Sequence, residues 1–213
     1  MLDGLLAPAD YARFVVTLTA VLDPFLAIPI FLAVTASRSA KQRVRLVNAV
    51  ALTVFAVLTG AALFGEQVLT AVGTGLPAFR VGGGLVLLLM ALAMLNAEAG
   101  GLRQSKDEAR ELAEGEAQGV VPLAVPLLAG PGAISTTIVA AQSGGPVHQA
   151  GIIACVLVVC ALTWGVLRLA DPIGAKLGTT GLNIATRLLG LLLAALGVQE
   201  IATGLRGLFP ALG

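Results

Sequence analysis

The chain has 213 residues, of which 57% are hydrophobic and 12% are charged, and its formal net charge at pH 7 is +1. Soluble domains carry about 25% charged residues, so this composition excludes a soluble globular protein and indicates an integral membrane protein. A near-neutral chain without a basic stripe has no means of displacing the counterions of DNA or RNA, which excludes a nucleic-acid partner.

The apolar runs predict six membrane-spanning helices. Each run reaches the roughly 20 residues that a helix needs to cross the hydrocarbon core of a bilayer. The chain starts with Asp3 where a signal peptide has basic residues, so we expect no cleavable signal peptide. The predicted spans cover residues 11–36, 43–65, 77–97, 120–143, 148–170 and 183–208.

The first span is interrupted by a carboxylate and two prolines. Asp23 lies about 18 Å from Tyr11 at about 1.5 Å per residue, near the bilayer midplane. Pro24 and Pro29 each remove a backbone donor, so we expect the helix to break there, with Asp23 capping a second half-helix. An ionisable group at this depth indicates a functional site; the alternative is a kink in which Asp23 only satisfies its own backbone.

Most of the basic residues fall on one predicted side of the membrane. Arg13, Arg80 and Arg206 fall on one predicted side of the membrane, and the remaining ten Lys and Arg residues fall on the other. The positive-inside rule therefore predicts that the odd-numbered loops are cytoplasmic and that both termini lie outside. In the third loop, Ser105 and Glu108 have the spacing of a capping box, which predicts a short surface helix.

The second half of the chain resembles the first. A shift of 107 residues places Asp23-Pro24 on Gly130-Pro131 and Arg80-x-x-Gly83 on Arg187-x-x-Gly190. Three spans in each half would make the second half enter the membrane from the opposite face, which is the inverted-repeat architecture of many secondary transporters. We therefore predict a first three-helix repeat at 1–97, a cytoplasmic connector at 98–119 and a second, inverted repeat at 120–213.

The fourth span is the predicted counterpart of the first. Three prolines and two glycines between residues 121 and 137 are incompatible with one continuous helix. We expect a half-helix to begin at Pro131, with its amide donors and positive dipole end at the membrane centre. Because Gly130 and Gly132 offer no side-chain cap, that end is open to an anionic group of a ligand. Hydroxyl donors can be added by Ser135, Thr136 and Thr137, which can also bond to their own helix.

The two breaks have complementary polarity, which suits an amino acid zwitterion. Its carboxylate fits the open end at residues 130–133, and its ammonium group fits Asp23 or nearby free carbonyls. The predicted substrate-binding residues are Asp23, Pro24, Ala27, Gly130, Pro131, Gly132, Ala133, Ser135 and Thr136.

The other intramembrane charges are interpreted mainly as structural. Arg80 at the start of the third span and Glu200 in the outer part of the sixth lie toward the same side of the membrane, so we expect them to pair, while Arg187 can extend to the interface. Glu200 is also the second candidate for proton coupling, after Asp23. The single histidine, His148, is interpreted as a lone residue of a short outer loop.

Three blocks of the sequence resemble motifs of one family. Asp23-Pro24-x4-Pro29-Ile30-Phe31-Leu32 is similar to the first-span motif of the MarC family of bacterial inner-membrane proteins. Residues 121–134 are similar to its fourth-span motif almost throughout, and residues 80–84 are similar to a third. Where many members have Gly-Asn, this chain has Leu26-Ala27. The resemblance covers essentially the whole chain and implies a six-span protein of the inner membrane, with proton-linked transport of glycine, alanine or serine in some members.

The leading hypothesis is therefore a secondary transporter of small neutral amino acids. It would use a proton or other ion gradient, because the chain has no phosphate-binding loop, and we expect no cofactor. An ion or metal exporter would need ligands clustered at one depth, and the spans offer only Asp23 and Glu200 at different heights. A drug or small-solute efflux protein and a non-transporting envelope protein stay open, as does a homo-oligomer. An intramembrane enzyme would need a nucleophile with a base, paired aspartates or H-E-x-x-H, none of which is found.

Overall fold

The computed structural model describes residues 8–36, 38–95, 128–142, 144–209 and 211, and the regular secondary structure within them is helical. Five segments are long and apolar enough to cross a membrane, and the helix at 131–141 is shorter and also apolar. The fourth predicted span, residues 120–143, lies partly outside the described residues, and the predicted surface helix of the connector lies wholly outside them. The five segments are Pro8–Leu32, Ala40–Val72, Leu76–Leu95, Pro146–Arg168 and Thr180–Leu208.

The outer surface of the helices is apolar. Leu52 is 68% exposed, Leu188 is 66% exposed and Phe64 is 61% exposed. Large apolar side chains at this exposure would form patches that water-soluble monomers avoid, whereas lipid tails solvate them. The surface and the helix lengths together confirm a multi-pass integral membrane protein.

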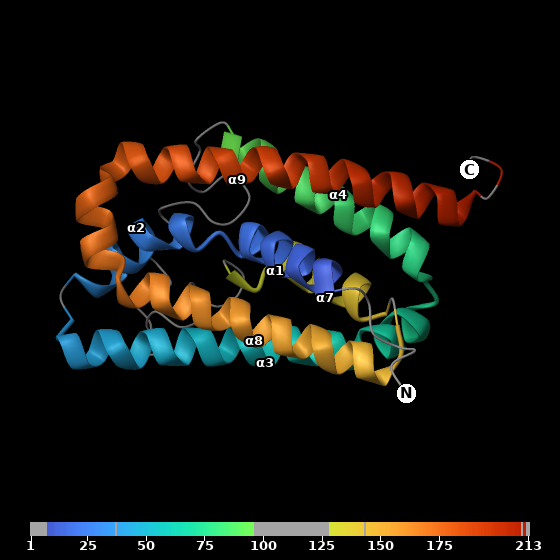
Figure 1. Ribbon diagram of the computed structural model, residues 1–213, viewed down its shortest axis with the longest axis horizontal. Helices are drawn as coiled ribbons and strands as arrows, with labels where there is room; N and C mark the ends of the chain where they lie inside the picture. The colour runs from blue at the N-terminus through green and yellow to red at the C-terminus, as the bar shows by residue number, and fades with distance from the viewer. Residues whose placement is uncertain (1–7, 37, 96–127, 143, 210, 212–213) are drawn as a thin grey trace.

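The described helices pack in three layers (Figure 1). One layer contains α4 and α9, the opposite layer contains α3 and α8, and α1, α2 and α7 lie between them. The two outer layers thus enclose the elements on which the sequence places the two breaks. The helices are α1 (Pro8–Leu22), α2 (Pro24–Thr35), α3 (Ala40–Val72), α4 (Leu76–Leu95), α7 (Pro131–Ala141), α8 (Pro146–Arg168) and α9 (Ala170–Leu208).

The predicted break of the first span at Asp23 is confirmed. Asp23 separates α1 from α2 and has a φ of 42°, a left-handed conformation that few residues other than glycine adopt. The backbone N–H of Leu26 donates to Asp23 Oδ1 at 3.2 Å, so the carboxylate caps α2 with Pro24 at its first position. The side chain of Asp23 is fully buried.

The predicted start of a half-helix at Pro131 is also confirmed. Gly130 is the N-cap of α7 in an extended conformation, and no side chain caps this end. Proline at the first position fits a helix start because its missing N–H would have no partner within the helix. The first turn of α7 therefore presents backbone donors, unlike the first turn of α2.

Helix α3 is longer than the predicted span of residues 43–65. Ser39 and Gln42 form a reciprocal capping box at its start, and Gly73, with a φ of 76°, ends it in a left-handed turn. The 33 residues extend over about 50 Å, which exceeds the roughly 30 Å of the hydrocarbon core. Local capping signals, rather than apolar length, set these bounds.

Helix α9 is bent at Gly178, where φ is 59° and ψ is −176°. The bend separates residues 170–177 from the long segment that follows (Figure 1). Arg43 of α3 donates through Nη1 to both carboxylate oxygens of Asp171 at 3.0 Å, and through Nε to the Thr35 carbonyl at 3.1 Å. These contacts tie the end of α2 and the starts of α3 and α9 together at one end of the molecule, called here the basic end.

Helices α4 and α9 pack through small residues that recur every seven positions. A Cβ atom at Gly84 would lie 2.6 Å from the Gly197 carbonyl oxygen, and one at Gly197 would lie 2.8 Å from the Gly84 carbonyl oxygen. Backbones approach this closely only where side chains are absent, as in other membrane helix pairs. The antiparallel contacts join Pro77 to Gly204, Gly84 to Gly197 and Ala91 to Gly190.

The interpretation of His148 as a lone loop residue is wrong. His148 lies in the first turn of α8 and is fully buried, because the helix already starts at Pro146. Its Nε2 lies 2.8 Å from the Ala140 carbonyl oxygen, and its Nδ1 lies 3.1 Å from the Tyr11 hydroxyl. Since a carbonyl only accepts, Nε2 carries the proton and the Tyr11 hydroxyl donates to Nδ1. One imidazole thus joins α1, α7 and α8.

Replacing His148 by phenylalanine is expected to destabilise the protein by about 1–3 kcal/mol, because the imidazole's partly buried hydrogen bonds to the Ala140 carbonyl and the Tyr11 hydroxyl are lost. Tyr11→Phe removes one hydrogen bond without leaving a buried hydroxyl, so its effect is expected to be smaller. Unfolding in detergent measures both, with Val147→Ala at an exposed neighbouring position as the control. An unchanged midpoint for His148→Phe would contradict this role of the imidazole.

Candidate functional site

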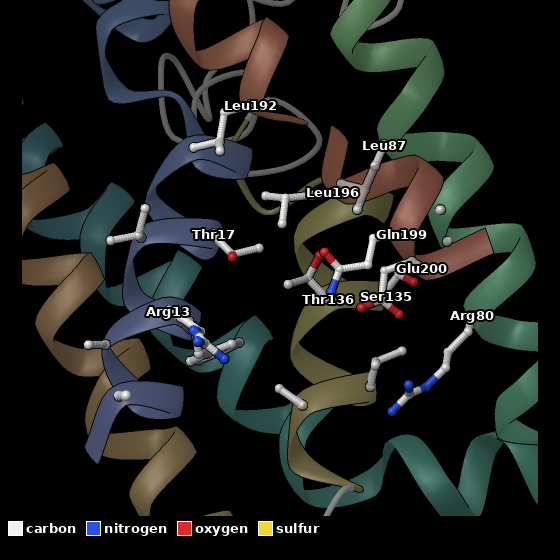
Figure 2. Close-up of a pocket in the computed structure, with 18 residues that line it drawn as sticks. Arg13, Thr17, Arg80, Leu87, Ser135, Thr136, Leu192, Leu196, Gln199 and Glu200 are labelled. Atoms are coloured by element: carbon white, nitrogen blue, oxygen red, sulfur yellow. The ribbon is translucent and has the colours of Figure 1, made fainter. Parts of the chain in front are cut away.

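A cavity of about 860 Å³ lies between α1, α4, α7 and α9 (Figure 2). It is lined by residues 9–17 of α1, 80–87 of α4, 135–140 of α7 and 192–200 of α9, so it lies nearer the end of the molecule where α1 begins and α7 ends than the basic end. Its size is in the range of small-molecule sites, about 300–1,000 Å³. Its polar lining consists of Arg13 and Thr17 of α1, Arg80 of α4, Ser135 and Thr136 of α7, and Gln199 and Glu200 of α9.

Two polar atoms in this lining are buried without a hydrogen-bond partner in the part of the chain that the structure describes. They are Oε2 of Glu200 and Oγ1 of Thr136. A buried polar atom that lacks a partner costs about 1–3 kcal/mol. A ligand with hydrogen-bond donors would recover this cost, so the two atoms mark the polar centre of the cavity.

Two arginines flank this polar centre. Figure 2 shows Arg13 and Arg80 approaching from opposite sides, with Thr136 and Glu200 between them. The Arg13 side chain is 80% exposed and contacts Asp10 at 3.4 Å, so it lies at the outer edge. The guanidinium of Arg80 interacts electrostatically with the Glu200 carboxylate. The cavity therefore combines cationic and anionic groups from different helices.

The inner end of the cavity is apolar and adjoins the two breaks. Leu87 lines the cavity, and its Cδ2 would lie 3.1 Å from a Cβ atom at Gly132. The same Cβ position lies 2.9 Å from Met90 Sδ and 3.4 Å from Val21 Cγ1. Since Val21 comes two residues before Asp23, the first turn of α7 packs beside the end of α1. Leu87 is thus the side chain between the cavity and the first turn of α7.

The structure divides the predicted site residues into two groups. Ser135, Thr136, Arg80 and Glu200 line one cavity, so the two charges expected to pair do face the same space. Arg187 is exposed on α9 and does not line it. The residues of the two breaks lie outside its lining, and Asp23, Ala27 and Ala133 are fully buried. This second group consists of Asp23, Pro24, Ala27, Gly130, Pro131, Gly132 and Ala133.

The sequence interpretation missed Arg13 and Thr17 as lining residues. They are four residues apart in α1, so their polar side chains lie on the same face of an otherwise apolar helix. That spacing was the available signal. Within the described residues, no three His, Cys, Asp or Glu side chains gather closely enough to hold a metal ion.

Comparisons with known proteins identify relatives across almost the whole chain. The sequence model of a family described as MarC family integral membrane protein matches residues 9–209. The chain is 36% identical over 203 residues to UPF0056 membrane protein YhcE of Escherichia coli (strain K12), covering 95% of this chain and 94% of that protein. It is 34% identical over 199 residues to UPF0056 membrane protein YvbG of Bacillus subtilis (strain 168), covering 92% and 94%. No solved structure matches the chain.

Proposed function

This chain belongs to the MarC family of integral membrane proteins, and we propose that it is a secondary transporter of small neutral amino acids of the glycine, alanine and serine class. The observation that carries the proposal is the cavity between α1, α4, α7 and α9, which brings buried polar groups next to two interrupted helices. Secondary transporters commonly bind substrate at such interruptions near the midplane.

The proposed architecture is two inverted three-helix repeats, at 1–97 and 120–213. The corresponding helices α2 and α7 start 107 residues apart and contain 12 and 11 residues. Helix α3 ends at the left-handed Gly73, and the helical stretch that begins at Pro146 reaches the left-handed Gly178. The matching lengths and endings support an internal repeat. In this architecture the α4–α9 contact joins one repeat to the other.

The proposed substrate site lies between the two breaks. The uncapped first turn of α7 offers backbone donors and a positive dipole end to the substrate carboxylate. Asp23, buried at the start of α2, offers a negative charge to the ammonium group. A solute would reach this site from the cavity once Leu87 moves, and rocking of one repeat against the other would expose it at the basic end.

We further propose that the basic end faces the cytoplasm of a bacterial cell and that both termini lie outside. The starts of α3 and α9 lie together at this end, and the positive-inside rule assigns their Lys and Arg residues to the cytoplasmic side. Protons are the proposed coupling ions, with Asp23 and Glu200 as their carriers, because ionisable groups within membrane helices commonly serve proton relays.

Counterflow in proteoliposomes tests the proposed function. Vesicles preloaded with unlabelled glycine or alanine are expected to accumulate the same radiolabelled amino acid above the level of protein-free vesicles. Vesicles preloaded with a lipophilic organic cation are the comparison, and no accumulation of that cation is expected. Exchange of the cation alone would favour drug efflux, and exchange of neither solute class would contradict a transporter of this kind.

A further inference from the structure

We propose that the cavity holds a second, outer binding site for a zwitterionic α-amino acid, in which Glu200 receives the ammonium group and Arg80 the carboxylate. The proposal rests on the proposed function for the class of solute. It places the charged groups of the solute at Glu200 and Arg80, which are not part of the site between the breaks, so the cavity would be the first place where the solute is held.

The polar centre of the cavity provides acceptors for an ammonium group. An ammonium group has three donors and no acceptor. Oε2 of Glu200 and Oγ1 of Thr136 are buried oxygens without a partner among the described residues, and both line the same cavity. Ser135, which is 6% exposed, adds a third oxygen to this wall. A bound ammonium group would satisfy these oxygens and neutralise the carboxylate, which a solute without a cationic group would not do.

Arg80 provides the complementary donor for a carboxylate. A guanidinium carries five N–H donors in a planar fork that matches a carboxylate, so it can interact with Glu200 and with a ligand at once. Arg80 enters the cavity from α4, across from Thr136 of α7 (Figure 2). The opposite charges of Arg80 and Glu200 thus line one space at the contact between α4 and α9. This separation of charge matches a zwitterion better than a simple anion or cation.

The apolar end of the cavity determines where the substrate side chain lies. Leu87, Leu192 and Leu196 line it, so a methyl or similarly small apolar group would contact them. The volume of about 860 Å³ exceeds what glycine or alanine fills, so the solute would share the cavity with water. The site would therefore hold the solute loosely before it passes Leu87.

Three ligands that differ by one group test the assignment of the two charges. L-alanine carries both groups, L-lactate replaces the ammonium group by a hydroxyl, and L-alaninamide replaces the carboxylate by an amide. Affinities are measured from the ligand-induced shift of the unfolding midpoint of purified full-length protein. Glu200→Gln is expected to lower the affinity for L-alanine by about tenfold or more, as for the loss of a charge-assisted hydrogen bond. The affinity for L-lactate is expected to change by no more than about twofold. Arg80→Gln is expected to lower the affinities for L-alanine and L-lactate and to leave the affinity for L-alaninamide unchanged.

Two matched variants and one alternative keep the test decisive. Glu66→Gln on α3 and Arg206→Gln on α9 remove the same charges at exposed positions outside the cavity, and they are expected to change none of the affinities. If Glu200→Gln does not fold, Thr136→Val is used, with a weaker affinity for L-alanine relative to L-lactate expected.

The assignment is overturned if Glu200→Gln, or Thr136→Val in its place, lowers the affinity for L-lactate as much as the affinity for L-alanine. If the wild-type protein exchanges alanine in counterflow and the variant shows this equal loss, the outer site alone is refuted. A wild-type protein that exchanges no amino acid would refute the proposed function.

Discussion

Replacing Asp23 by asparagine is expected to leave the protein folded and to lower glycine and alanine exchange by about tenfold or more, the effect of losing one hydrogen bond to a charged group. Asparagine caps helices as well as aspartate does and also tolerates the left-handed backbone found at this position. The carboxylate charge is then the main property that changes. Counterflow together with unfolding in detergent measures both parts of the expectation.

The Asp23→Ala variant separates the charge from the cap. Alanine cannot accept the hydrogen bond from the Leu26 N–H, so this variant is expected to lose about 1–2 kcal/mol of stability as well as transport. An Asp23→Asn protein that exchanges amino acids at the wild-type rate would show that the carboxylate only caps α2, and the proposed substrate site would then be wrong.

The second large effect is expected at Gly84, in the contact between α4 and α9. A methyl group there would lie 2.6 Å from the Gly197 carbonyl oxygen and 2.9 Å from the Ile201 backbone nitrogen. Backbone atoms cannot rotate away as side chains do, so the two helices would have to separate. Gly84→Ala is therefore expected to destabilise the protein by about 1–3 kcal/mol, the usual cost of overpacking.

Gly82, two positions earlier in the same helix, is the matched control. A methyl group there would meet nothing within 4 Å, so Gly82→Ala is expected to be neutral or to stabilise α4 by up to about 1 kcal/mol. Thermal unfolding of both variants in the same detergent gives the comparison. Equal midpoints for the two variants would contradict the close packing of α4 against α9.

The two helix starts at the breaks could be predicted because they depend on local chemistry. The Asp23-Pro24 and Gly130-Pro131 pairs each combine a cap position with a proline that fits only the first turn of a helix, so sequence alone located both starts. The shared cavity of Arg80 and Glu200 could be anticipated because unpaired charges within membrane spans are costly and opposite charges there usually pair.

Other features depend on tertiary packing and were not accessible in this way. The glycines before Pro146 look like a loop, yet His148 is buried because Gly144 and Gly151 leave room for the His148 and Tyr11 rings. The bend of α9 at Gly178 has no proline to mark it. The outer cavity depends on how four helices meet, and no local pattern encodes that arrangement.

If the cavity is the entry path of the solute, position 136 is accessible from outside, and thiol labelling of a Thr136→Cys variant measures this accessibility. In a background without Cys155 and Cys160, which do not line the cavity, a membrane-impermeant thiol reagent is added from outside. We expect the Thr136→Cys protein to be labelled and L-alanine to slow the labelling. A Thr70→Cys control at an exposed position of α3 is expected to be labelled at the same rate with or without L-alanine. Labelling at position 136 that L-alanine does not slow, or no labelling there at all, would contradict this entry path.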